Sequence, residues 1–204
     1  MAKLYFKYGA MGAAKSAQAL VTRYNYEERG MKVWCIKPAV DIRGSKDTIS
    51  SRVGLDAECT PIEASDDIVE IYKSFKVKPG VVIADESQFF SPEQIDQLRE
   101  LVDITDTAVL CFGLRTDFRT KLFPGSARLM EIADSIEEIK TMCACGKKAT
   151  VNARLDEEGN IVTEGRQIEL GGNDRYEPMC HRCYSERLIT PSMIDVANLI
   201  AVDG

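Results

Sequence analysis

The chain has 204 residues and a formal net charge of −6, and its mixture of apolar and charged residues is that of an ordinary globular protein. This length is sufficient for one full α/β core and a small additional domain. No run of Lys or Arg is long enough to follow a nucleic-acid backbone or an anionic membrane, and no apolar run approaches the roughly 20 residues of a membrane span. We therefore expect a small-molecule partner, no nucleic acid, no membrane and, since no apolar signal segment is seen at the N-terminus, a cytoplasmic location.

The first predicted elements are a buried strand at Leu4–Tyr8, a loop of small residues and a helix that continues through Ala17–Val21. The loop nearly matches G-x-x-x-x-G-K-[ST], in which backbone N–H groups surround phosphates, the Lys reaches the β- and γ-phosphates and the hydroxyl holds Mg²⁺. Ala14 stands where the second Gly belongs. By itself the loop is also compatible with an ordinary strand-to-helix turn. The candidate phosphate-binding residues are Gly9, Ala10, Met11, Gly12, Ala13, Ala14, Lys15 and Ser16.

A second strand and a long polar segment follow the first helix. Gly30 ends the helical pattern, and Met31–Ile36 has the composition of a strand, which predicts a β-α-β unit and a parallel sheet. Asp41–Gly54 is polar, lacks periodicity and is too long for a simple connection, so it is either an active-site lid or a disordered loop. A helix is expected over Asp66–Phe75.

The apolar run Val81–Ala84 ends in two carboxylates, Asp85 and Glu86. Such a run is typical of a fully buried parallel strand that delivers acidic groups to a ligand crevice. Phosphoryl transfer requires an acid at this place to hold Mg²⁺. Taken alone, the two acids are also compatible with a solvated strand end, but their order after Lys15 and Ser16 favours a nucleotide site.

The remaining elements of the first domain continue the α/β pattern. Ser91, Pro92 and Gln94 are typical of the N-cap, N1 and N3 positions of a helix, which places Asp85–Phe90 on a strand-to-helix loop. The other expected elements are a strand at Thr107–Phe112, a polar loop at Arg115–Lys121, a helix around Ala127–Ala133 and a last strand at Ile136–Met142.

The pattern changes after Met142 to closely spaced cysteines and alternating residues. Ala149–Leu155 and Ile161–Leu170, separated by a turn at residues 158–160, predict a β-hairpin. Two cysteine pairs flank the hairpin and supply four soft ligands, as in a structural Zn²⁺ ribbon: Cys143, Cys145, Cys180 and Cys183. The first pair has only one residue between its members, so a lost or substituted ligand and unliganded reduced thiols both remain open.

These elements predict an α/β fold, with a P-loop (RecA-like) parallel-sheet domain followed by a small C-terminal zinc-ribbon β domain. We expect the nucleotide-binding domain at residues 1–141, the zinc-binding domain at 142–190 and a C-terminal tail at 191–204.

Four segments resemble the type II thymidine kinase family, and the resemblance covers almost the whole chain. They are Tyr8–Ser16, Asp85–Phe90, Gly113–Phe118 and Gly171–Tyr176. The resemblance implies transfer of the γ-phosphate of ATP to the 5′-hydroxyl of thymidine, and also of deoxyuridine, for nucleotide salvage. It further implies ATP, Mg²⁺ and structural Zn²⁺ as cofactors, dTTP as a feedback inhibitor and a homotetramer.

The resemblance also implies roles for individual residues. Glu86 matches the general base, Ser16 and Asp85 match Mg²⁺-binding residues, and Asp41 and Arg43 match residues near Mg²⁺ and the transferred phosphate. The expected nucleoside-binding residues are Met11, Phe89, Leu114, Phe118, Phe123, Ile168, Gly171, Gly172 and Tyr176. Ordinary core packing is an equal alternative for Leu114 and Phe123. Gln88 and Asp117 are expected to shape their loops by hydrogen bonding.

Two other functions remain compatible with the sequence. The nucleotide motifs alone permit another P-loop nucleotide kinase or an ATPase that carries a zinc ribbon. Ala14 and the short Cys143–Cys145 pair also permit a zinc-ribbon binding module on a nucleotide fold that has lost its activity.

Overall fold

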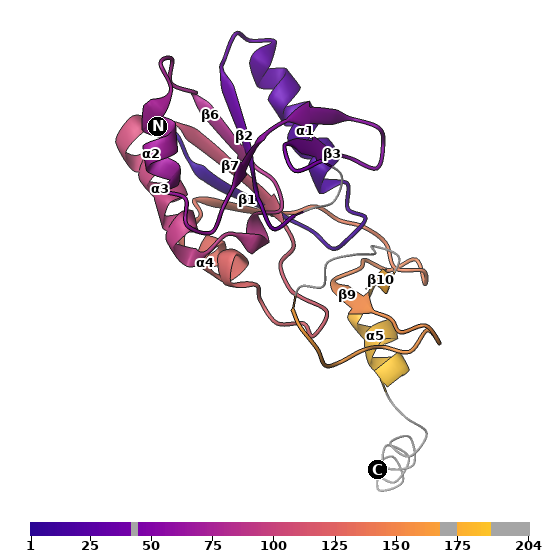
Figure 1. The fold of residues 1–204 in the computed structure, drawn as a ribbon. Coiled ribbons are helices and arrows are strands. Elements are labelled where there is room, and N and C mark those ends of the chain that lie inside the picture. Colours follow the sequence, from indigo (N-terminus) through magenta and orange to yellow (C-terminus); the bar gives the residue numbers. More distant parts are fainter. Residues whose placement is uncertain (42–44, 168–174, 189–204) are drawn as a thin grey trace, which may run out of the picture.

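The computed structural model describes residues 1–41, 45–167 and 175–188. Its larger part is a six-stranded sheet flanked by helices, and a smaller part carries the C-terminal helix (Figure 1). The strand order is β5-β2-β6-β7-β1-β8, and every neighbouring pair is parallel. The strands are β1 (Leu4–Tyr8), β2 (Val33–Pro38), β5 (Thr60–Ile62), β6 (Val81–Ala84), β7 (Ala108–Gly113) and β8 (Ser135–Glu138). The predicted α/β fold with a parallel sheet is confirmed.

Helices cover both faces of the sheet. In Figure 1, α2, α3 and α4 lie on one side of the sheet and α1 on the other. Alternate side chains of a strand contribute to the cores on opposite faces of the sheet. In β6, Val82 and Ala84 belong to one apolar core, and Val81 and Ile83 belong to a second. Because both faces are buried, the strands are continuous apolar runs. The helices are α1 (Lys15–Glu27), α2 (Ile68–Ser74), α3 (Pro92–Thr105), α4 (Pro124–Ile132), α5 (His181–Leu188) and the short 3₁₀ helix η1 (Ser87–Phe89).

The helix start predicted from the sequence is confirmed at α3. The Ser91 hydroxyl accepts a hydrogen bond from the Gln94 backbone N–H, the Gln94 side chain accepts one from the Ser91 N–H, and Pro92 occupies the first turn. This reciprocal capping satisfies two donors that the helix itself leaves without partners. The connection from β6 to α3 carries both predicted acids, and this capping fixes the end of the connection at which α3 begins. None of the helices in the described ranges is both long enough and apolar enough to cross a membrane.

The long polar segment contains regular structure that the sequence did not predict. Within its described part, β3 (Thr48–Ser50) pairs antiparallel with β4 (Asp56–Glu58) and forms a two-stranded ribbon. Ile49 is buried in the core beside α1, at 1% exposure, whereas its two neighbours on β3 are not buried. One buried residue is too few to create an alternating pattern, which explains why this strand was missed.

The predicted hairpin is confirmed only at its turn end, and the main partner of its first strand lies elsewhere in the chain. β9 (Val151–Arg154) pairs antiparallel with β10 (Tyr176–Met179), whereas the described part of the second alternating run makes only an isolated bridge, between Leu155 and Ile161. Met179 of β10 is buried with Val151 of β9 in a common core, and this burial favours β10 over the nearer run as the partner of β9. The predicted turn is confirmed by Gly159 with φ 83°. Residues 168–170 of the predicted run lie outside the described residues, and the predicted domain boundaries stay a prediction.

Candidate active site

The loop between β1 and α1 has the conformation that its motif requires, despite Ala14. Gly12 has φ 77°, and Ala14, the N-cap residue of α1, has φ 56° and ψ 31°. The left-handed region costs a residue with a Cβ about 1–2 kcal/mol, so Ala14 occupies a strained position that Gly would accept freely. Ala14 makes no side-chain cap, and Lys15 opens the helix. A helix N-terminus of this kind favours an anion.

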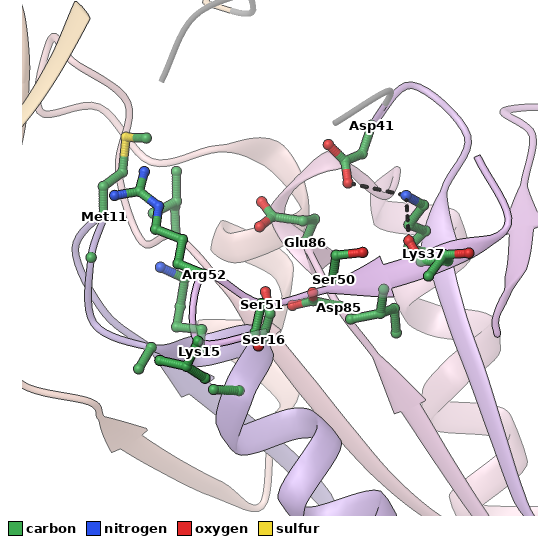
Figure 2. A pocket seen from close by; sticks show the side chains of 17 residues that line it. Met11, Lys15, Ser16, Lys37, Asp41, Ser50, Ser51, Arg52, Asp85 and Glu86 are labelled. Carbon is green, nitrogen blue, oxygen red and sulfur yellow. Dashed lines mark hydrogen bonds and ion pairs between the residues drawn. The ribbon is translucent and has the colours of Figure 1, made fainter. Parts of the chain in front are cut away.

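A cavity of about 240 Å³ lies beside this loop. Five segments contribute to its wall: the loop with the start of α1, the end of β2 with Asp41, the β3 segment, the end of β6, and Leu114 after β7 (Ala108–Gly113). In Figure 2, the cationic groups of Lys15 and Arg52 lie at one side of the cavity and the Glu86 carboxylate lies between them and Asp41. The structure thus brings residues from the predicted phosphate loop, the polar segment and the acidic pair to one cavity.

Asp85 and Glu86 are buried at the end of β6, at 3% and 6% exposure. The Oδ1 atom of Asp85 is buried and has no hydrogen-bond partner among the described residues. Burial, followed by the charge of Glu86, raises the pKa of Asp85 to about 7, against the opposing effects of Ser16 and Lys15. A buried carboxylate oxygen without a partner, beside a hydroxyl, matches the hard oxygen ligands that Mg²⁺ prefers. The donor set at Ser16 and Asp85 therefore fits a divalent cation.

Glu86 is held in an unusual backbone conformation, with φ 50° and ψ 35°. Its Oε2 accepts a hydrogen bond of 2.6 Å from Gln88 Nε2, and Gln88 Oε1 accepts one of 2.9 Å from the Leu114 N–H. Strained residues of this kind persist only where the surroundings enforce them, and they cluster at functional sites. The loop-shaping role predicted for Gln88 is confirmed, and it fixes the orientation of the Glu86 carboxylate.

The predicted role of Asp117 in its loop is confirmed in the same way. Its Oδ1 accepts hydrogen bonds of 2.9 Å from the backbone N–H groups of Arg119 and Lys121, and its Oδ2 accepts one of 3.1 Å from Gln167 Nε2. These bonds order the segment that follows β7.

Lys15 lies folded over its own loop. Its Nζ donates to the carbonyl oxygens of Gly9, at 3.2 Å, and Ala10, at 3.0 Å, and the residue is only 7% exposed. The ammonium group thus lies beside the loop that would surround a phosphate, at the wall of the cavity.

Two charged cavity residues were missed by the sequence analysis. Lys37 of β2 is 1% exposed, and its Nζ lies 3.5 Å from Asp41 Oδ2 and donates to the carbonyls of Ser45 and Thr48 at 2.9 and 3.0 Å. It therefore ties Asp41 to the β3 segment. A charged residue inside an apolar strand was the available signal. Arg52 follows β3, lines the cavity and carried no signal beyond its charge.

The predicted nucleoside-binding residues fall into two groups in the structure. Met11 and Leu114 line the cavity. Phe89 and Phe123 contact each other edge to face, with ring centroids 5.5 Å apart, and Phe118 is buried with the Arg154 guanidinium 4.1 Å from its ring centroid. Tyr176 begins β10, opposite Arg154. Arg43, Ile168, Gly171 and Gly172 lie outside the described residues.

The four predicted metal ligands meet at one place. Their sulfur atoms lie within 4.8 Å of one another, and those of Cys145 and Cys180 are 3.7 Å apart. Zn–S bonds of about 2.3 Å in a tetrahedron put neighbouring sulfurs about 3.8 Å apart, so the cluster fits Zn²⁺. Backbone N–H groups of Cys145 and Cys180 lower the pKa of the Cys143 thiol to about 6. The short first pair therefore still brings both of its sulfur atoms to the other pair, and the cluster is compatible with the predicted zinc ribbon.

Comparison with known proteins decides the family. The model of the thymidine kinase family matches residues 2–184. The chain belongs to the thymidine kinase family. It is 46% identical over 190 residues to a thymidine kinase of Novosphingobium aromaticivorans, covering 92% of this chain and 99% of the relative. It is 44% identical over 190 residues to a thymidine kinase of Vibrio cholerae serotype O1, with the same coverage. A thymidine kinase of Legionella pneumophila subsp. pneumophila is 46% identical over 187 residues, covering 90% of both chains. The family resemblance predicted from the sequence is confirmed.

Proposed function

We propose that this chain transfers the γ-phosphate of ATP to the 5′-hydroxyl of thymidine, and of deoxyuridine, in the salvage of DNA precursors. The observation that carries the proposal is the cavity shared by Lys15, Ser16, Asp85 and Glu86, in a chain that belongs to the thymidine kinase family. Family membership supports thymidine and ATP as substrates. It disfavours both a general ATPase and a binding module without activity.

The phosphates of ATP bind at the start of α1. Backbone N–H groups at the end of the loop and at the start of α1 surround the phosphates, whereas the N–H groups of Gly9 and Met11 stay bonded to the Gly113 carbonyl and to Asn152. The Lys15 ammonium turns from its present carbonyl partners toward the β- and γ-phosphates. Arg52, across the cavity, adds a second positive charge. Mg²⁺, when bound, neutralises charge that develops on the phosphates. Ser16 and Asp85 would hold this ion, and by resemblance Asp41 and Arg43 would act on it and on the transferred phosphate.

Glu86 acts as the general base. A carboxylate at the cavity wall accepts the proton of the 5′-hydroxyl as that oxygen attacks the γ-phosphate. Gln88 holds the carboxylate in place, which limits the reorganisation needed when the nucleoside binds.

The nucleoside lies on the Leu114 side of Glu86. Met11 and Leu114 give this side apolar surface at the cavity. By resemblance, Phe89, Phe118 and Phe123 belong to the nucleoside pocket; they follow the carboxyl ends of β6 and β7, where parallel sheets bind ligands, and Phe118 and Phe123 are buried, so they would support the pocket from behind its surface. By resemblance, Ile168, Gly171, Gly172 and Tyr176 close the site over the base and sugar.

Zn²⁺ in the four-cysteine cluster is structural, because four thiolates leave no coordination position for a reactant. A homotetramer, feedback inhibition by dTTP and a cytoplasmic location complete the proposal, and each is supported by family resemblance.

The substrate assignment is tested by measuring ADP release with thymidine, deoxyuridine, deoxycytidine and guanosine, each with Mg²⁺ and again with EDTA. We expect Mg²⁺-dependent ADP release with thymidine and deoxyuridine only. Equal ADP release without any nucleoside would contradict the proposal and indicate an ATPase. A preference for guanosine would indicate another nucleoside kinase.

A further inference from the structure

The first half of the phosphate loop is built against the cysteine-rich part of the chain, which lies far from it in sequence. Ala10 belongs to the same apolar core as Cys143, Val151 and Met179. A Cβ placed on Gly9 would collide with the backbone carbonyl of Ile139, the residue that follows β8 by one position. The loop therefore rests on structure that is completed only by residues near the C-terminus.

Asn152 of β9 makes the polar part of this contact. It is 3% exposed, its Oδ1 accepts the Met11 backbone N–H at 2.8 Å, and its Nδ2 donates to the Thr116 carbonyl at 3.0 Å. A backbone N–H can only donate and a carbonyl can only accept, so these two partners fix the orientation of the amide. One buried side chain thus joins β9, the phosphate loop and the segment after β7.

Two other contacts from the same part of the chain reach the segment after β7 and not the phosphate loop. The Tyr184 hydroxyl of α5 donates to the Phe118 carbonyl at 3.1 Å, and the Arg154 guanidinium covers the Phe118 ring. Of the described side chains, Asn152 is the one with a hydrogen bond recorded to both the phosphate loop and this segment.

The bond from Asn152 adds to the contacts that hold the first half of the loop, which include the bond from the Gly9 N–H to the Gly113 carbonyl and those from the Lys15 ammonium to the Gly9 and Ala10 carbonyls. Gly12 and Ala14 both have left-handed backbone conformations, so the loop belongs to neither a strand nor a helix. A loop that is ordered before its ligand arrives avoids the entropic cost of ordering during binding. Without Asn152, the part-buried Met11 N–H would lose this partner, and the loop would lose the hydrogen bond that joins it to β9.

We propose that Asn152 is a positioning residue through which the cysteine-cluster domain sets the geometry of the phosphate loop and hence the affinity for ATP. The inference rests on the proposed role of this loop in binding ATP, and it assigns the C-terminal domain an effect on the nucleotide in addition to the nucleoside. The cysteine cluster then supports phosphate binding through β9, which lies between the cluster and the loop.

The test is calorimetric titration of the full chain with Mg²⁺–ATP in the absence of nucleoside, together with metal content and melting temperature. Asn152→Leu removes both hydrogen bonds at similar volume. Tyr184→Phe is the matched control, because it removes one buried hydrogen bond from the same part of the chain without touching the phosphate loop. We expect Asn152→Leu to raise the Kd for ATP about tenfold, with the metal retained, and Tyr184→Phe to change it less than about twofold.

The two variants separate positioning from general stability. If both variants raise the Kd for ATP in proportion to their loss of melting temperature, or if Asn152→Leu binds ATP as the wild type does, the inference is wrong. If Asn152→Leu fails to fold, Asn152→Ser takes its place in the test. The short serine side chain cannot reach both hydrogen-bond partners, so this variant should raise the Kd for ATP at least about threefold. A wild-type protein that fails to bind Mg²⁺–ATP would instead overturn the proposed function, and with it the inference.

Discussion

Replacing Ala14 with Gly should stabilise the free protein. Ala14 has φ 56° and ψ 31°, a conformation that costs a residue with a Cβ about 1–2 kcal/mol. Gly adopts it freely, but the more flexible unfolded chain offsets about 0.4–1 kcal/mol of this gain. We therefore expect the free energy of unfolding to rise by up to about 1.6 kcal/mol, which corresponds to a rise in melting temperature of up to about 5 °C for a chain of this size.

Two neighbouring substitutions provide controls for this measurement, made by thermal denaturation without nucleotide. Gly12 has φ 77° and open space where a Cβ would lie, so Gly12→Ala should introduce the strain alone and lower the melting temperature. Ala13 is buried and lacks a positive φ, so Ala13→Gly should also lower it, through a lost methyl group and added chain entropy. If Ala14→Gly lowers the melting temperature as Ala13→Gly does, the left-handed conformation does not describe the loop in the free protein.

Three further predictions concern the acids, the cysteines and the loop. Asp85→Asn should lower turnover about 10²-fold or more, because a charged ligand of the reacting centre is lost. The same change should not lower the melting temperature, since the buried Oδ1 of Asp85 has no partner among the described residues. Steady-state rates and thermal denaturation measure the two effects, and wild-type turnover in this variant would exclude Asp85 from the site. Cys145→Ser should release bound zinc and lower the melting temperature, and elemental analysis that finds no zinc in the wild type would contradict the assignment. Gly9→Ala should destabilise the protein, because a Cβ would collide with the Ile139 carbonyl, and an unchanged melting temperature would contradict that packing.

The central strands and the start of the site could be predicted because their signals are local. Val81–Ala84 is apolar throughout and Leu4–Tyr8 is apolar or aromatic except for Lys7, and both lie in a sheet covered on both faces, so the predicted and observed ranges coincide. Ser91 and Gln94 specify the start of α3 by their own hydrogen bonds. These two signals together locate the carboxyl end of β6, and therefore the position of Asp85 and Glu86, from the sequence alone.

The remaining features depend on contacts between distant residues. The partner of β9 is chosen by burial of Met179 with Val151, whereas the local alternation favoured a nearer hairpin. Ile49 alone anchors β3, which leaves no pattern to read. Lys37 and Asn152 acquire their places only when the sheet and the C-terminal domain are assembled, so residue type alone could not identify their partners.

The most direct test of the proposed phosphoryl transfer is Glu86→Gln, a change that keeps the size of the side chain and removes its basicity. Single-turnover transfer from labelled ATP to thymidine should fall by about 10²–10⁴-fold, the range for loss of a general base. Titration with Mg²⁺–ATP should show affinity close to that of the wild type, because the Lys15 loop is unchanged. Transfer at the wild-type rate in this variant would contradict the role of Glu86 as the base.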